Sequence, residues 1–205
     1  MRPGYTRAQA GAVKEEAMMQ PRDYTGRLLN HVEMLHQPGE RELAKRLYEA
    51  LGCTVTDRGG RTFSSHVAPE HPDMQNNVLY CSEVSPQQWK LEQEFRKALG
   101  AYDSLAQAKA VYDEKVTHAP HGITHFGIRY PSIAKLEETV KNFDARLDPA
   151  LKKRTRLVRV YRPEDKDSIS TGTVQAFVVT DIVAAGLFVL GQLIELQGQK
   201  EGVRV

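Results

Sequence analysis

Hydrophobic and polar residues alternate over positions 28–35, and this alternation predicts a β-strand. Val32 and Met34 fall on one face of the expected strand, whereas His31 and Glu33 fall on the other. A period of two residues is typical of a strand with one face buried against a core. We therefore expect His31 and Glu33 to face a cavity on the side opposite the core.

A second alternating segment covers positions 123–130 and also carries a histidine near its start. His125 and Arg129 share one face of this expected strand, and Phe126 and Ile128 share the other. The two histidines, His31 and His125, are 94 positions apart, and the same kind of apolar face stands behind each of them. Both strands are thus expected to present a histidine towards an open side.

The same series of predicted elements follows each of the two strands. Leu43, Leu47 and Leu51 recur every four residues, which is typical of the apolar face of a helix. Ser132 suits the N-cap of a corresponding helix after the second strand. The expected helices cover 40–51 and 133–143, and the expected later strands cover 53–56, 61–67 and 78–82, then 157–161, 174–180 and 187–197. Internal repetition predicts an α+β fold built from two βαβββ units.

A segment of different character separates the two units. Ser85 and Pro86 match the N-cap and first residue of a helix, and a second helix is expected over 104–116. This helical insertion is predicted to act as a lid, a dimer arm or a packing brace. The expected division is a loosely held N-terminal arm at 1–26 with a possible helix at 8–19, a first unit at 27–84, the insertion at 85–117, a second unit at 118–198 and a C-terminal tail at 199–205.

Composition is that of an ordinary globular protein, with 40% hydrophobic residues and a net charge of +2. This charge gives no reason to expect nucleic acid or a membrane surface as a partner. The longest apolar run, 182–190, is far shorter than the ~20 residues of a membrane helix. Cys53 and Cys81 form no CxxC motif, and no signal peptide is apparent, so we expect a reduced, cytoplasmic protein.

Four short motifs carry a resemblance to a known superfamily. They are Asn30-His31-Val32, residues 44–52, Thr124-His125-Phe126 and residues 193–196. With the two βαβββ units, the chain resembles the vicinal oxygen chelate superfamily, which includes glyoxalase I, extradiol dioxygenases and bleomycin resistance proteins. The resemblance covers roughly residues 28–197. It implies that the units form a cupped, barrel-like mixed sheet and that the protein is a homodimer.

The resemblance also implies a divalent metal ion in the cup, bound from the first and last strands of the units. His31 and His125 match the first-strand histidines, and Glu195 matches the last-strand carboxylate. Two imidazoles and one carboxylate suit Fe, Mn, Ni or Zn, and they leave coordination positions open for a substrate. The metal hypothesis therefore rests on His31, His125 and Glu195.

The fourth ligand position of glyoxalase I corresponds to Tyr80 in this chain, when residues 78–81 are aligned with 193–196. Glu83 would reach the site only through a bulge, since it should lie on the opposite strand face. We expect Tyr80 to act as an acid or to hydrogen-bond a substrate oxygen. Glu33 and Arg129 are candidates for lining the substrate cavity or for pairing with each other.

These observations support two functions. The first is a metal-dependent enzyme, of dioxygenase, lyase or isomerase type, that binds a small substrate through vicinal oxygens and stabilises an anionic intermediate. The alternative is a metal-free protein that sequesters a small molecule in the same cup, like bleomycin resistance proteins.

His118 and His121 are interpreted as parts of a polar connecting loop.

Basic residues gather between positions 152 and 162. A solvated strand face is the usual interpretation of such a run. The functional alternative is attraction of a carboxylate or phosphate on the substrate. No nucleic-acid recognition motif accompanies these charges.

Overall fold

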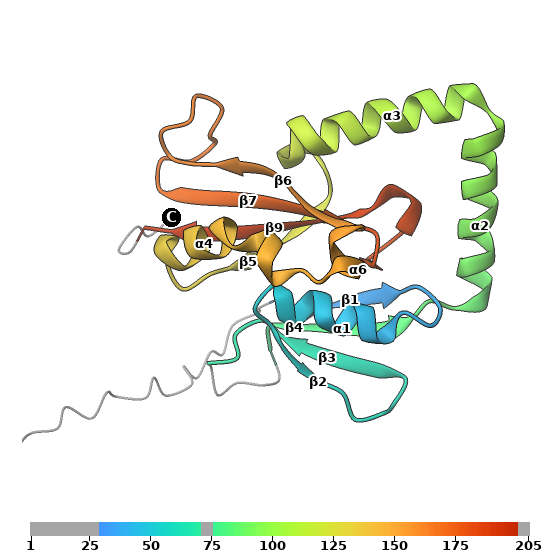
Figure 1. Ribbon diagram of the computed structural model, residues 1–205, viewed down its shortest axis with the longest axis horizontal. Coiled ribbons are helices and arrows are strands. Elements are labelled where there is room, and N and C mark those ends of the chain that lie inside the picture. Colours follow the sequence, from blue (N-terminus) through green and yellow to red (C-terminus); the bar gives the residue numbers. More distant parts are fainter. Residues whose placement is uncertain (1–28, 71–75, 201–205) are drawn as a thin grey trace, which may run out of the picture.

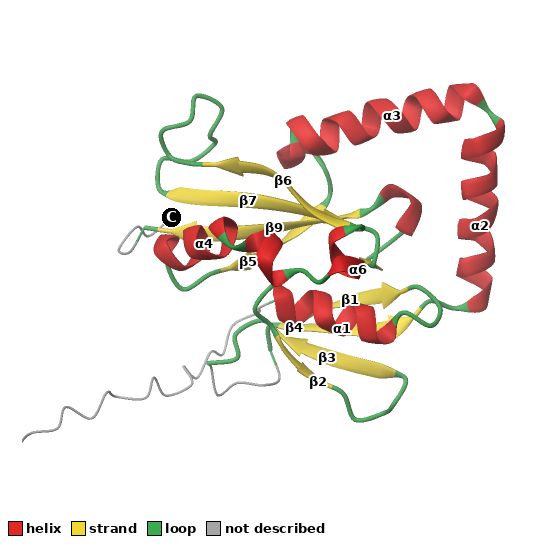
Figure 2. Cartoon of the chain, in the orientation of Figure 1, coloured by secondary structure: helices red, strands yellow, loops and turns green. Residues whose placement is uncertain are grey.

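The computed structural model describes residues 29–70 and 76–200, which form a mixed α+β structure with two β-sheets (Figures 1 and 2). The predicted N-terminal arm, its possible helix and most of the predicted tail lie outside these residues. Among the helices of the described part, none is both long and apolar enough to cross a lipid bilayer.

Sheet A has five strands in the order β2-β3-β4-β1-β8. β1 pairs in parallel with β4, and His31 stands opposite Val78 in this register. β3 is antiparallel to both β2 and β4, so three predicted strands of the first unit are confirmed in this sheet. The strands are β1 (His31–His36), β2 (Thr54–Thr56), β3 (Thr62–His66), β4 (Val78–Glu83) and β8 (Val183–Ala184).

Sheet B has four strands in the order β5-β9-β7-β6. β5 pairs in parallel with β9, and β7 lies antiparallel between β9 and β6. The strands are β5 (His125–Arg129), β6 (Thr155–Tyr161), β7 (Thr173–Thr180) and β9 (Gln192–Gln199). The predicted strand at 187–197 is wrong in its first part, because a 3₁₀ turn, η2 (Phe188–Leu190), ends at Gly191 with φ +73° before β9 begins.

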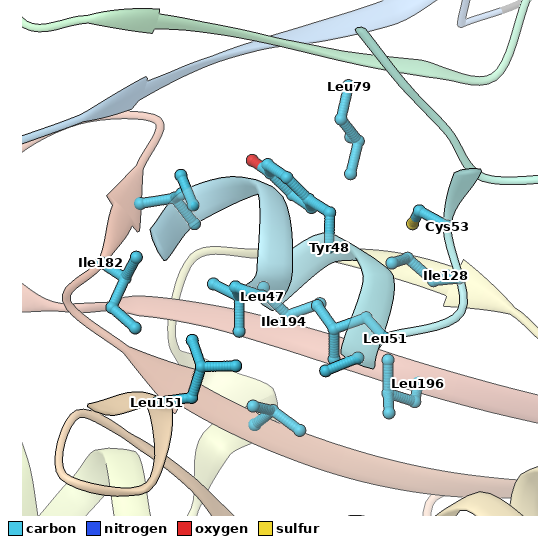
Figure 3. Close-up of a cluster of buried hydrophobic side chains, with 14 of the residues drawn as sticks. Leu47, Tyr48, Leu51, Cys53, Leu79, Ile128, Leu151, Ile182, Ile194 and Leu196 are labelled. Carbon is cyan, nitrogen blue, oxygen red and sulfur yellow. The ribbon is translucent and has the colours of Figure 1, made fainter. Parts of the chain in front are cut away.

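Helix α1 (Arg41–Ala50) packs between the two sheets and joins them into one core. Figure 3 shows Leu47 of α1 and its C-cap residue Leu51 near Ile194 and Leu196 of β9, while Tyr48 lies on the side of Leu79 from β4. The expected barrel-like sheet is therefore wrong: the described strands form two separate sheets and no closed barrel. The physical reason is that apolar residues of both sheets are buried in one core together with α1, which lies between them.

The second unit contains more helix than the pattern predicted. Ser132 caps α4 (Ile133–Lys141) as expected, accepting a hydrogen bond from the Lys135 N–H. The predicted helix continues, after a break, as α5 (Phe143–Arg146). The basic segment at 147–154, expected to be a linker, contains the short helix α6 (Pro149–Lys152). Its N-cap is Asp148, whose carboxylate accepts from two backbone N–H groups, so the Asp-Pro pair was the missed helix signal.

The predicted helices of the insertion are confirmed as α2 (Pro86–Ala101) and α3 (Asp103–His118). Ser85 caps α2 through the Gln88 N–H. In Figure 1 the two helices form an L that leaves sheet A after β4 and returns over sheet B. The C-terminal part of α3 and the following 3₁₀ turn, η1 (Pro120–Gly122), pack on the face of sheet B turned away from α1.

Candidate functional site

Each sheet has one face that points away from α1, which we call its outer face. A connected group of polar side chains lies on the outer face of sheet B. On the outer face of sheet B, His125 of β5 and Glu195 of β9 are in contact, with 3.1 Å between His125 Nε2 and Glu195 Oε2. Gly127 stands opposite Glu195 in the β5–β9 register, so no side chain at that position separates the two groups. Two of the three predicted metal ligands are thus brought together.

The hydrogen bonds of His125 define which of its nitrogens carries a proton. Its Nδ1 lies 2.7 Å from the carbonyl oxygen of Ile123, which can only accept. Nδ1 must therefore carry hydrogen, and in a neutral ring Nε2 would then present its lone pair to the Glu195 carboxylate. Two lone pairs at this distance repel each other, so the pair must hold a proton or another cation between Nε2 and Oε2.

A second pair of side chains extends this contact across the sheet. Gln175 of β7 donates from Nε2 to Glu195 Oε1 at 2.8 Å. The Gln175 Oε1 atom lies 3.2 Å from His121 Nε2, which must act as the donor to this amide oxygen. His121, interpreted from the sequence as a loop residue, therefore belongs to the site. No sequence signal distinguished it, because its partner is 54 positions away on another element.

Aromatic side chains enclose this group of four residues. Phe177 of β7 contacts both His121 and His125 edge-on, at ring-centre distances of 4.9 and 5.4 Å. Tyr161 of β6 lies 4.4 Å from the His121 ring. Phe177 is fully buried, and it packs in one apolar cluster with Leu193 of β9 and Val116 of α3. The site is therefore a partly buried polar group in contact with aromatic rings.

The third predicted metal ligand, His31, lies on the outer face of sheet A together with Tyr80. His31 is exposed, its Nδ1 is 2.8 Å from Asn30 Oδ1, and its ring contacts Tyr80 edge-on at 5.3 Å. Within residues 29–70 and 76–200, no group of three or more His, Cys, Asp or Glu side chains is arranged to hold a metal ion. His31 accordingly does not join His125 and Glu195 in this structure.

The other predicted residues are divided between the two sheets. Glu33 accepts a hydrogen bond from Ser82 on sheet A. Arg129 is exposed at the end of β5 on sheet B, and it forms no ion pair with Glu33 or any other described residue. Glu83 lies on the opposite side of β4 from Tyr80, where its carboxylate accepts from the Gly39 N–H. Glu83 thus stabilises a turn and stays away from the outer face.

The two cysteines are removed from both outer faces. Cys53 and Cys81 are buried in the core, and they are free thiols. Burial raises the pKa of each thiol to about 12. Since a thiolate is the form that attacks substrates or binds metals, neither cysteine is a candidate nucleophile or ligand at neutral pH.

Comparison with known proteins returned no match, either to a protein-family model or to a curated protein sequence. The resemblance to the vicinal oxygen chelate superfamily therefore stays a prediction from the motifs.

Proposed function

We propose that this protein is a metal-dependent enzyme of the vicinal oxygen chelate type, acting on a small substrate. The observation that carries the proposal is the contact of His125 Nε2 with Glu195 Oε2, two atoms that need either a proton or a metal ion between them. A divalent metal ion bound there would replace the proton, and it would act as a Lewis acid towards substrate oxygens. Fe, Mn, Ni and Zn all accept this donor set.

The hydrogen bonds around His125 and Glu195 are of the kind that orient the ligands of a metal ion. Ligating histidines usually donate their other ring N–H to a carbonyl or carboxylate, which fixes the tautomer. Ile123 does this for His125, and Gln175 holds the remaining oxygen of Glu195. These bonds would keep both ligands oriented without any rearrangement. His121 in turn orients Gln175, and Phe177 restricts water around the histidine ring.

The third ligand of the proposal, His31, is on the other sheet. We propose that it reaches the pair when two copies of the chain associate, in the homodimer that the resemblance implies. His31 is exposed and lies beside Tyr80, so both side chains are available at the surface for such a contact. In this arrangement Tyr80 would hydrogen-bond a substrate oxygen or supply a proton, and Glu33 and Arg129 would line the cavity.

We also propose that the chain contains two copies of a βαβββ unit. In sheet A the order from the edge is β2-β3-β4-β1, and in sheet B it is β6-β7-β9-β5. The first and last strands of each unit pair in parallel. His31 stands opposite Val78 in β4, and His125 stands opposite Leu193 in β9. Two residues further along each partner strand is a candidate site residue, Tyr80 in β4 and Glu195 in β9. This match supports the duplication.

The competing function is metal-free binding of a small molecule. It is favoured by the separation of His31 from the other two ligands, because a protonated His125–Glu195 pair is then complete without a metal ion. Under this alternative the side chains of His125 and Glu195 would bind a polar group of the ligand directly.

Metal analysis separates these two functions. Protein purified without a metal-chelating tag, and then reconstituted anaerobically with Fe(II), Mn(II), Ni(II) or Zn(II), should retain close to one metal ion per chain after gel filtration. His125→Ala and Glu195→Ala should each lose it. His118→Ala, at an exposed histidine outside the site, is the matched control and should retain it.

The same samples also test the contribution of His31. His31→Ala should weaken metal retention, and the molar mass of the loaded protein by light scattering should be that of a dimer. Absence of bound metal in every reconstituted sample would overturn the enzyme proposal and favour the binding function. Metal retained in full by both Glu195→Ala and His125→Ala would place the metal elsewhere.

A further inference from the structure

A cavity of about 440 Å³ lies inside the L formed by α2 and α3, apart from the His125–Glu195 pair. Its walls come from four separate parts of the chain: both helices of the insertion, the segment from α6 into β6, the end of β7, and η2 with Gly191. The volume is within the usual range of small-molecule sites, roughly 300–1,000 Å³.

The lining of this cavity is strongly basic, with six Lys or Arg residues and two Asp residues. Two of the six cations are neutralised within the wall. Lys109 pairs with Asp113 at 2.5 Å, and Arg154 pairs with Asp181 at 2.7 Å. The other four form no ion pair with any described residue: Arg96, Lys152, Lys153 and Arg156. Elsewhere in the same basic run, Arg159 and Arg162 do have carboxylate partners, Asp167 and Glu137.

The four unpaired side chains are exposed, so water and salt screen their mutual repulsion, but together they give the cavity an excess of positive charge that attracts anions. A single carboxylate would leave most of this charge uncompensated. A phosphate or diphosphate group carries two to three negative charges, and it accepts hydrogen bonds from Lys and Arg on several sides. The charge count therefore favours a phosphorylated ligand.

The lining of the cavity also includes apolar side chains, which the carbon part of an organic ligand could contact. Val179 of β7 and Val189 and Leu190 of η2 provide this surface, whereas the Phe188 side chain is only 1% exposed. A free inorganic anion would leave this apolar surface facing water. A lining that combines basic and apolar side chains is suited to an organic phosphate.

The buried carboxylate of Glu92, one helical turn before Arg96 in α2, fixes the position of this helix beside the cavity. Glu92 is completely buried, and its two oxygens accept from the N–H groups of Phe188 at 2.7 Å and Val189 at 3.1 Å. Trp89 packs edge-on against Phe188, and the Arg96 guanidinium lies over the Trp89 ring at 5.5 Å. These contacts fix α2 to η2, so the cavity wall exists before any ligand binds.

We propose that this cavity is a binding site for a small organic phosphate with an apolar body, recognised by Arg96, Lys152, Lys153 and Arg156. The inference does not depend on the metal hypothesis, since none of these residues contacts His125 or Glu195. It assigns a role to the helical insertion: α2 and α3 complete the wall of a ligand site whose other wall is the edge of sheet B.

The test is calorimetric titration of the full chain with three probes: geranyl diphosphate, inorganic pyrophosphate and geraniol. Geranyl diphosphate should bind saturably with one site per chain. Pyrophosphate should bind at least several-fold more weakly, and geraniol should bind more weakly still. Raising the salt concentration should weaken the binding of both anions, because the rim charges are exposed to solvent.

The decisive variant is Lys153→Gln combined with Arg156→Gln, which should lower the affinity for geranyl diphosphate at least ten-fold. The matched control is Lys141→Gln combined with Lys166→Gln. Both of these lysines are exposed, lie outside the cavity and have no ion pair in the described structure, and the net charge changes equally. The control should bind like the wild type.

Stability without ligand gives a second readout. Because the variant removes repelling charges, its urea midpoint should equal or exceed that of the wild type, so lost binding would not reflect unfolding. Three results would overturn the proposal: no saturable binding of geranyl diphosphate, pyrophosphate binding as tightly as the organic probe, or an equal loss of affinity in the control.

Discussion

The outer faces of the two sheets have matching strand registers, yet their polar groups are held in different ways. On sheet B, Glu195 is 8% exposed, and the side chain of His125 is 21% exposed. On sheet A, His31 is exposed and Tyr80 is half-buried. Opposite Tyr80 stands Ser64, whereas Phe177 stands opposite Glu195. The polar group on sheet B is therefore more buried than the one on sheet A.

The difference follows from what covers each face. A polar group removed from water must find a partner in the protein, at a cost of about 1–3 kcal/mol if it does not. The covered face accordingly shows a continuous series of hydrogen bonds through His125, Glu195, Gln175 and His121. The open face has shorter groups of bonds, such as Thr62–Ser82–Glu33, whose members can also bond to water.

The largest expected effect comes from removing the ring that closes the covered face. Phe177→Ala should lower the free energy of unfolding by about 3–5 kcal/mol, because it leaves a cavity between His121, His125 and Tyr161. Urea denaturation measures this loss. Ser64→Ala, at the equivalent place on sheet A, is the control and should stay within about 0.5 kcal/mol of the wild type. Equal losses at both sites would contradict the comparison.

The next effect concerns coupling between side chains. A double-mutant cycle of His125→Ala and Glu195→Ala, in metal-free buffer, should give an interaction energy of about 1–3 kcal/mol, since the two groups share one cation in a partly buried site. The cycle of Glu33→Ala and Ser82→Ala on the open face should give less than about 1 kcal/mol. A larger coupling on sheet A than on sheet B would show that exposure does not control the strength of these pairs.

A third prediction tests how well the core behind sheet A is closed to water. Burial raises the pKa of the Cys53 thiol to about 12, against about 8.5 for an unfolded cysteine. Below about pH 8.5 the thiol is protonated in both the folded and the unfolded chain, so it does not lower the free energy of unfolding. Between about pH 8.5 and 12 only the unfolded chain releases the thiol proton, so the free energy of unfolding falls as pH rises.

Comparison with Cys53→Ala isolates this effect from the other titrating groups. Between pH 9 and 11 the wild type should lose about 1 kcal/mol per pH unit relative to the variant, measured by urea denaturation. A constant difference between the two proteins over this range would mean that the thiol ionises as readily in the folded protein as in the unfolded chain.

The smallest expected effect is that of Tyr80→Phe on the open face. Its hydroxyl forms no hydrogen bond with another described residue, so the free energy of unfolding should change by less than about 0.5 kcal/mol. The matched change on the covered side is Tyr161→Phe, which removes a bond of 3.4 Å to the His118 carbonyl. Its cost should be somewhat greater, and thermal unfolding of both variants measures the difference.

Most of the secondary structure followed from local patterns. Alternation located β1 and β5, leucine spacing located α1, and Ser85 and Ser132 marked the starts of α2 and α4. These signals depend on neighbours a few residues apart, which is why they can be detected along a single chain. Where two local signals competed, as at Gly191 and at Asp148, the predicted boundaries were wrong.

The candidate site was predictable only in part. The pairing of β5 with β9 brings His125 and Glu195 together, two residues that the superfamily resemblance implied would share a site. His121 and Gln175 joined them through contacts between elements far apart in the chain. The position of His31 depended on how the two sheets pack around α1, which no periodicity within a strand can specify.

The sequence alone determined which residues face away from the core, since a period of two or 3.6 residues follows directly from strand and helix geometry. The tertiary structure decided which of those faces is covered and which charges surround a common cavity. The helices α2 and α3 contribute to both outcomes. The end of α3 packs on the outer face of sheet B, and both helices line the cavity together with the basic α6–β6 segment. Such contacts depend on the burial of apolar surface between distant segments, a property of the folded chain as a whole.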